Sequence, residues 1–319
     1  MRIIISIIAA AVLSLAATPV PAQPPAPSYE QLRNWCYTDS TDDESLLGCD
    51  AVIAAEREPP QGLAAAYFNR GKSYEYKNEP KRAIEDYGQA IRLMPTAYPA
   101  FYARGNQHRF LDQYDLAIAD YDRAIELKPN YTEAISARGD AYYGKGQYER
   151  AIVDYDRAID LSPRDFQQFQ MRALAYARSG QHARALEDYD RVIELGMSDI
   201  ETLSNRCFSR AVVGRLEAAL EDCNASLERV PEFSDALAHR GFADLKLGRL
   251  VEAIADYDLA LGTDARNWEA TKRSAALFGR GVARRRTGDT AGGDADIAAA
   301  KALQADIADN FVKWGVSGF

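Results

Sequence analysis

Apolar and small residues recur along the chain in pairs of short segments with the spacing of amphipathic helices. One such pair covers Ala100 to Arg109 and Ala117 to Leu127, and four residues, Leu111 to Tyr114, join its two segments. Proline ends the second segment of several pairs, because it cannot continue the hydrogen-bond ladder of a helix. These prolines are Pro95, Pro129, Pro163 and Pro231. The pattern predicts an all-α protein built from helical pairs.

The helical pairs repeat in a single register, and every copy is as far from the next as Arg70 is from Arg104. An arginine marks the first segment of each copy and an alanine marks the second: Arg70, Arg104, Arg138, Arg172, Arg206 and Arg240, with Ala83, Ala117, Ala151, Ala185, Ala219 and Ala253. A seventh copy, marked by Arg280, follows after a slip of six residues. One helical pair cannot bury its apolar face alone, so neighbouring pairs must stack into a continuous core. We expect seven repeats, at 64–97, 98–131, 132–165, 166–199, 200–233, 234–267 and 274–307.

Small residues recur where the two helices of a pair should cross closely, and an aromatic residue fills the adjoining gap. The small residues are Gly71, Gly105, Gly139 and Gly241, and the aromatics are Tyr87, Tyr121, Tyr155, Tyr189 and Tyr257. The period, the two-helix content and this order of residues resemble the tetratricopeptide-repeat (TPR) family, over roughly 63–307. The resemblance implies a right-handed superhelical solenoid of antiparallel helix pairs. Its first helices would line a concave groove.

The two ends of the repeat region have weaker versions of the pattern. Residues 29–63 form a degenerate helical pair in the sequence, which we interpret as an N-terminal cap. Residues 308–319 are interpreted as a C-terminal capping segment, with Phe311 and Trp314 covering exposed core. Each cap would shield one open end of the solenoid from water.

The N-terminus has the composition of a secretory signal peptide. Met1 and Arg2 precede thirteen uncharged residues, Ile3 to Leu15, and small residues lead up to Ala22. This apolar run is shorter than the ~20 residues that a membrane-spanning helix needs, which favours cleavage after Ala22 over retention as an anchor. A Pro-rich tether at 23–28 follows. The mature protein is therefore expected in the periplasm or outside the cell, without membrane insertion.

Four cysteines in an exported chain predict disulfides, although four can pair in three ways. In the repeat register, Cys207 stands at the small-residue position and Cys223 at the aromatic position, so the two should touch. By elimination, Cys36 then pairs with Cys49 across the N-terminal cap. Four free buried thiols are the alternative. A metal site is disfavoured, because no further His or Cys lies at ligand spacing.

An aspartate follows each repeat arginine at position i+16, even in the seventh copy. TPR proteins usually have an apolar residue at the arginine position, so this pairing departs from the family pattern. We predict a ladder of structural ion pairs: Arg70 with Asp86, Arg104 with Asp120, Arg138 with Asp154, Arg172 with Asp188, Arg206 with Asp222, Arg240 with Asp256 and Arg280 with Asp296. The alternative is a row of arginines that recognises carboxylates or phosphates of a ligand.

Charge and residue content exclude several function classes. The 47 acidic residues outnumber the 38 basic ones, which argues against a general binder of nucleic acid or anionic membranes. The three histidines, His108, His182 and His239, lie at non-equivalent repeat positions without a recognisable nucleophile or metal partner. No phosphate-binding glycine loop is present either. We therefore expect no catalysis, no cofactor and no metal.

The resemblance implies that the first helices bind an extended peptide or a helix of a partner protein. The groove candidates mix aromatics with charges of both signs: Phe68, Lys72, Tyr76, Tyr102, Asn106, Arg109, Phe110, Asp140, Tyr143, Arg178, Phe208, Phe242 and Lys246. We expect an exported, non-catalytic protein- or peptide-binding scaffold, acting in cell-envelope assembly. A solvated inner face without a ligand, a self-associating structural protein and an envelope enzyme with an unrecognised site are the alternatives. The partner and its motif are not encoded in any pattern found.

Overall fold

The computed structural model describes residues 26–38, 42–262 and 268–319, so the expected signal peptide and its cleavage site lie outside the described residues. The described residues form seventeen helices and no strand. The helices are α1 Tyr29–Tyr37, α2 Asp42–Ala55, α3 Pro60–Tyr76, α4 Pro80–Leu93, α5 Tyr98–Phe110, α6 Tyr114–Leu127, α7 Thr132–Gly144, α8 Tyr148–Leu161, α9 Phe166–Arg178, α10 His182–Glu194, α11 Ile200–Val212, α12 Leu216–Arg229, α13 Ser234–Leu247, α14 Leu250–Gly262, α15 Ala270–Thr287, α16 Thr290–Leu303 and α17 Ile307–Lys313. None of them is both long and apolar enough to cross a membrane.

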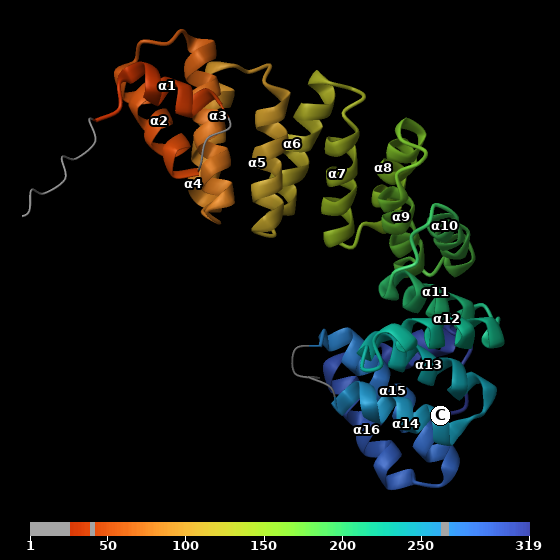
Figure 1. Ribbon diagram of the computed structural model, residues 1–319. Helices are drawn as coiled ribbons and strands as arrows, with labels where there is room; N and C mark the ends of the chain where they lie inside the picture. The colour runs from red at the N-terminus through yellow and green to blue at the C-terminus, as the bar shows by residue number, and fades with distance from the viewer. Residues whose placement is uncertain (1–25, 39–41, 263–267) are drawn as a thin grey trace, which may run out of the picture.

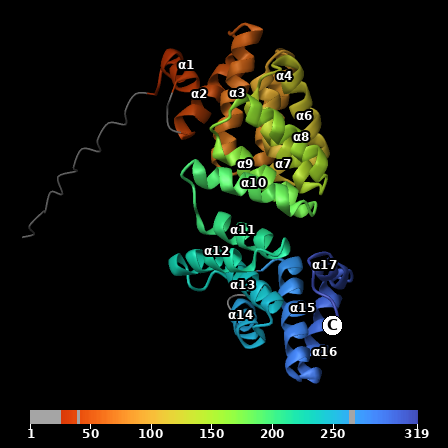
Figure 2. The same ribbon diagram turned by 90° about the vertical axis from the view of Figure 1, so that its right-hand side faces the viewer.

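Consecutive helices pack in antiparallel pairs, and the pairs stack on one another in chain order (Figure 1). The stack changes direction between α10 and α11, where neighbouring helices have the weakest contact in the repeat region (Figure 2). First helices of most successive pairs contact each other, most closely α11 with α13. The first helices therefore form the inner side of the curved stack. The predicted all-α solenoid is confirmed.

Glycine allows the two helices of a pair to cross closely. Gly71, Gly105 and Gly139 each face the tyrosine at position i+16, and a Cβ on any of them would lie 2.7–2.8 Å from its ring. The three rings (Tyr87, Tyr121, Tyr155) are fully buried. Any larger residue would push the helices apart, so the repeated Gly and Tyr together set the helix spacing.

The turn between the helices of a pair needs one residue with a left-handed backbone. Asn78 and Asp112 adopt φ of 57° and 56° in the first two repeats, and glycine takes over with φ of 72–98° in the rest: Gly146, Gly180, Gly214, Gly248 and Gly288. Asn, Asp and Gly are the residue types that tolerate this conformation best. The turn chemistry thus recurs with the repeat.

Both expected disulfides are present. Cys36–Cys49 joins α1 to α2, and Cys207–Cys223 joins α11 to α12. All four side chains are buried. In the fifth repeat a covalent bond therefore occupies the place where other repeats pack a tyrosine against a glycine.

The repeat arginines connect three helices rather than two. In each of the seven copies, Nε and Nη2 of the arginine donate to both oxygens of the aspartate at position i+16, over 2.6–2.9 Å. In six of them, Nη1 also donates at 2.5–2.8 Å to a side chain of the preceding pair: Asp50, Asp122, Asp156, Asp190, Asn224 or Asp258. Gly88 stands at that position beside Arg104. The arginine therefore ties each pair to the one before it.

Candidate functional site

One position of the first helices divides the inner face of the solenoid into two parts. It recurs once in each of the first six repeats, and in the second and third its residue accepts a hydrogen bond from the buried tyrosine. The residues are polar in the first three repeats (Lys72, Asn106, Asp140) and apolar in the next three (Leu174, Phe208, Phe242). We call the inner face of α3, α5 and α7 the polar groove, and the space enclosed by α9, α11, α13, α15 and α17 the aromatic cavity.

In the polar groove, the buried tyrosines donate hydrogen bonds to the polar residues of the first helices. Tyr121 Oη donates to Asn106 Oδ1 at 2.8 Å, and Tyr155 Oη donates to Asp140 Oδ1 at 2.9 Å. Burial raises the pKa of the Asp140 carboxyl. Arg109 Nη1 lies 3.8 Å from Asp140 Oδ2, and the buried Nε of Arg109 has no hydrogen-bond partner in the protein. One guanidinium donor in this part is thus left over.

Two aromatic groove candidates of the first repeats are exposed to solvent. Tyr76 and Phe110, at the ends of α3 and α5, are 72% and 63% exposed. Lys72 is exposed on the same helix as Tyr76. By contrast, Phe68 packs its ring 5.5 Å from that of Tyr87. The candidates in this part therefore include both free side chains and side chains engaged in packing.

A further groove candidate, Tyr102, lies between two other tyrosines. Its ring centroid is 6.1 Å from that of Tyr121 and 5.1 Å from that of Tyr131. Burial raises the pKa of Tyr121 and of Tyr131. Tyr102 is half-buried, so it contributes only one edge to the inner face.

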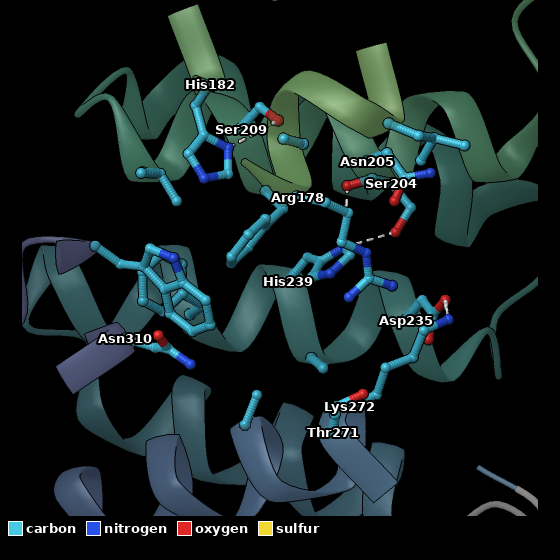
Figure 3. A pocket seen from close by; sticks show the side chains of 18 of the residues that line it. Arg178, His182, Ser204, Asn205, Ser209, Asp235, His239, Thr271, Lys272 and Asn310 are labelled. Carbon is cyan, nitrogen blue, oxygen red and sulfur yellow. Dashed lines mark hydrogen bonds and ion pairs between the residues drawn. The ribbon is translucent and has the colours of Figure 1, made fainter. Parts of the chain in front are cut away.

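The aromatic cavity has a volume of about 720 Å³ (Figure 3). Four groove candidates line it: Tyr143, Arg178, Phe208 and Phe242. The inner-face position of Ser204 was also expected, whereas sequence reasoning did not assign the following lining residues to a site: His182, Tyr189, Asp235, His239, Tyr257, Trp268, Lys272 and Trp314. The sequence contains a partial signal for this cavity, because Leu174, Phe208 and Phe242 replace the polar residues found at the same position of the first three repeats.

The C-terminal segment closes the cavity. α17 packs beside α15 (Figure 2), and Trp314 follows it directly. The Trp314 ring lies 5.1 Å from that of Phe208 on α11 and 5.9 Å from that of Phe242 on α13. The expected capping segment therefore covers the inner side of three repeats in addition to the end of the stack.

Lys246 holds this segment in place. Its Nζ donates to the backbone oxygens of Ala211, Val212 and Trp314, at 2.7, 3.1 and 2.8 Å. The carbonyls of Ala211 and Val212 are at the end of α11, where no further helical turn supplies donors and only one described backbone group, Gly214 N, donates to Ala211 O. Lys246 lies on the inner side as a groove candidate should, but its ammonium group is fully engaged within the chain.

Both histidines of the cavity are neutral at pH 7. Burial lowers the pKa of His182 and of His239 to about 4. His182 Nδ1 lies 3.3 Å from Ser209 Oγ, and His239 Nδ1 lies 2.8 Å from Ser204 Oγ. Ser204 is 1% exposed, and His239 Nδ1 also lies 3.0 Å from its backbone oxygen. His239 therefore packs against both oxygen atoms of Ser204.

The cationic groups of the cavity differ in their partners. Lys272 Nζ donates to Asp235 Oδ2 at 2.6 Å, and Trp268 Nε1 donates to Asp235 Oδ1 at 2.7 Å. Arg178 extends from α9 into the cavity beside His239 (Figure 3). Within the described chain, no carboxylate oxygen lies within 4 Å of the Arg178 guanidinium, which interacts with the Tyr143 hydroxyl instead. The positive charge of Lys272 is thus offset by Asp235, whereas that of Arg178 has no carboxylate beside it among the described residues.

Metal binding has no ligand set in the part of the chain that the structure covers. No three His, Cys, Asp or Glu side chains among these residues come together as a metal ion would require.

Family models for this repeat match the chain. One described as "TPR repeat" matches residues 105–146 and 139–180, and one described as "Tetratricopeptide repeat" matches residues 64–96. No curated protein matches the sequence.

Several solved structures are similar to this chain. A tetratricopeptide repeat protein from Parabacteroides merdae is 16% identical, with a TM-score of 0.63, over 79% of this chain and 98% of that one. YrrB, described as a TPR protein with an unusual peptide-binding site, is 23% identical, with a TM-score of 0.51, over 61% of this chain and 97% of that one. MamA is 26% identical, with a TM-score of 0.46, over 49% of this chain and 88% of that one. The regular repeat register, the matched repeats and the first two of these folds together show that this chain contains tetratricopeptide repeats and folds as a TPR solenoid.

Proposed function

We propose that this protein is an exported, non-catalytic scaffold that binds a segment of a partner protein in the polar groove. The observation that carries the proposal is the exposure of Tyr76 and Phe110, at 72% and 63%, at equivalent positions of neighbouring repeats. Large exposed aromatics anchor protein interfaces, because they bury much apolar area at a small loss of conformational entropy. Their repeat spacing would place them along one extended ligand.

Polar groups beside these aromatics support sequence-selective binding. Lys72 is exposed on α3, and the buried Arg109 Nε has no partner within the protein. Asp140, one repeat further, adds an acidic group. An extended segment would place apolar side chains on the aromatics and polar groups near these three residues. YrrB, which shares the fold, is described as having a peptide-binding site, and this analogy agrees with the proposal.

Binding in the polar groove is favoured over binding along the whole inner face. In the last three repeats the chain's own Trp314 rests on Phe208 and Phe242. Lys246, which could otherwise meet a ligand, is engaged with three carbonyl oxygens. The free part of the inner face is therefore that of α3, α5 and α7.

Site-specific photocrosslinking in cells tests this proposal. A photoreactive residue at Phe110 should capture a partner, whereas one at Val153, which is 65% exposed on the second helix α8, should not. The crosslinked segment of the partner, made as a peptide, should bind the purified chain. Replacing both Tyr76 and Phe110 with serine should weaken that binding roughly tenfold or more, because each exposed anchor is removed. Equal capture at both sites would contradict the proposal, and capture of only this chain would favour a self-associating structural protein.

Export is the second part of the proposal. Two disulfides are typical of proteins in oxidising compartments, which supports a periplasmic or secreted location and a role in the cell envelope. Mass spectrometry of protein purified from its natural host should find an N-terminus at Gln23 and no free thiol. A chain that begins at Met1 and reacts fully with a thiol reagent would contradict export.

A further inference from the structure

The aromatic cavity is closed to a peptide that runs along the inner face. Trp314 bridges Phe208 and Phe242, and Phe311 lies 5.7 Å from Phe242 between ring centroids. Lys246 links the backbone of Trp314 to the end of α11. What remains is a partly open space of about 720 Å³, within the range of small-molecule pockets.

Aromatic side chains gather in one part of the cavity, and Phe208 lies at their centre. Its ring centroid is 4.9 Å from that of His239, 5.1 Å from that of Trp314 and 5.4 Å from that of Phe242. His182 lies 5.5 Å away on the other side. Both imidazoles are neutral at pH 7, since burial lowers their pKa to about 4. This part of the cavity suits an apolar group.

Two buried hydroxyl groups at the cavity have no hydrogen-bond partner in the protein. They belong to Tyr189 and Tyr257, which line the cavity and are 0% and 1% exposed. In the first three repeats the same hydroxyl donates to an acceptor: Glu75, Asn106 or Asp140. Leu174 and Phe242 stand here at the repeat position that Asn106 and Asp140 occupy. Leaving a buried donor unpaired is unfavourable, so a ligand that brings an acceptor atom would be stabilised.

The remaining charges of the cavity favour an anion. Lys272 is paired with Asp235, and Arg178, Glu201 and Lys313 all lie at exposed positions of the lining. Arg178 extends into the cavity without a carboxylate within 4 Å among the described residues, and Glu269 acts on it only at longer range. A guanidinium binds a carboxylate through two parallel hydrogen bonds, which adds strength and direction.

We propose that the aromatic cavity binds a small amphipathic carboxylic acid. Its carboxylate pairs with Arg178, and the buried Tyr189 hydroxyl donates to the same end of the ligand. Its apolar body lies on Phe208 and Trp314. This site is separate from the polar groove, so it stands whether or not a partner protein binds there.

Intrinsic fluorescence provides a direct assay, because two of the three tryptophans, Trp268 and Trp314, line the cavity. The mature chain carrying Trp35→Phe is titrated with octanoate and with 3-phenylpropionate, and with octan-1-ol and octylamine as uncharged and cationic controls. At least one acid should change the emission and bind about tenfold or more tightly than octan-1-ol, the margin expected for a charge-assisted hydrogen-bonded pair. Calorimetry confirms the stoichiometry of one.

Three variants separate binding from folding. Arg178→Gln should remove the preference for acids, whereas Arg184→Gln, at an exposed arginine outside the lining, should leave it unchanged. Tyr189→Phe should weaken binding of the acid without lowering the melting temperature of the free protein, because it removes a donor that has no partner. If Tyr189 had only a structural role, Tyr189→Phe would change the melting temperature and leave binding of the acid unchanged.

Several results would overturn the proposal. These are no binding of either acid, equal binding of octanoate and octan-1-ol, or acid binding that survives Arg178→Gln. Binding of a peptide through its C-terminal carboxylate, with no binding of the free acids, would also overturn it. Loss of acid binding in the Tyr76 and Phe110 double variant would show that the two sites are not separate.

Discussion

The two aspartates that flank Arg138 should contribute very differently to stability. Arg138 donates through Nε and Nη2 to Asp154, at 2.9 and 2.6 Å, and through Nη1 to Asp122, at 2.6 Å. Their side chains are 3% and 45% exposed, and that of Arg138 is 20% exposed. The first pair is thus within the protein and the second is at its surface, so replacement of each aspartate by alanine compares the two environments around one arginine.

The expected magnitudes follow from this burial. Removing one member of a buried pair costs ~3–5 kcal/mol, because the other charge is left uncompensated. Arg138 keeps Asp122 and some contact with water, so we expect Asp154→Ala to lower the free energy of unfolding by ~2–3 kcal/mol. Asp122→Ala removes an exposed pair and should lower it by ~0–1 kcal/mol.

Urea denaturation of the mature chain at pH 7, followed by circular dichroism, measures both changes. The double variant Arg138→Leu, Asp154→Ala provides the control, since it leaves no buried charge without a partner and should be more stable than Asp154→Ala alone. Equal effects of Asp154→Ala and Asp122→Ala would refute the distinction. A double variant less stable than the single one would refute the physical reason given for it.

Three further predictions concern other parts of the repeat. Gly88→Ala and Gly88→Asp should each raise the free energy of unfolding by ~0.5–1 kcal/mol, because glycine is unfavourable inside a helix and an aspartate could also pair with Arg104. Molar salt should reduce the gain of Gly88→Asp and leave that of Gly88→Ala unchanged. Burial raises the pKa of Asp244 to about 6, so its carboxyl favours folding below pH 4 and loses that contribution as the pH rises through 6. Asp244→Asn should therefore raise the free energy of unfolding by ~1–3 kcal/mol at pH 7.5 and leave it unchanged at pH 4. An equal gain at both pH values would exclude the titration of this group. Replacing Cys207 and Cys223 with alanine should lower the free energy of unfolding by ~3 kcal/mol. The double variant Cys207→Gly, Cys223→Tyr should recover part of that loss, because it restores the glycine–tyrosine packing of the other repeats. No recovery would show that this packing does not transfer to the fifth repeat.

The repeat register determined most of the fold in advance. A constant period places equivalent residues at equivalent points of every helical pair, so local rules for helices apply seven times over. The same register brought Cys207 next to Cys223, and both disulfides are present. It also paired each arginine with the aspartate at position i+16, because the two positions face each other within one pair. All of these contacts are short in sequence.

A contact between repeats was overlooked although its signal was present. Asp122, Asp156 and Asp190 recur at the period of the repeat, as regularly as the arginines that they contact. Their role depends on how one pair packs on the next, and the sequence alone does not specify that geometry. Sequence reasoning therefore found the inner partner of each arginine and missed the outer one.

The candidate site depended most on tertiary structure. The resemblance to TPR proteins indicated Arg178, Phe208 and Phe242 as inner-face residues, and all three line the cavity. Only the folded chain shows that the C-terminal Trp314 lies on the α11 residue Phe208, which is remote from it in sequence. No periodic pattern encodes such a contact, because α17 is outside the repeat and its position is decided by the curvature of the whole stack. The sequence by itself thus determined a solenoid with an inner face, and the tertiary structure divided that face into the polar groove and an aromatic cavity partly covered by the C-terminal segment.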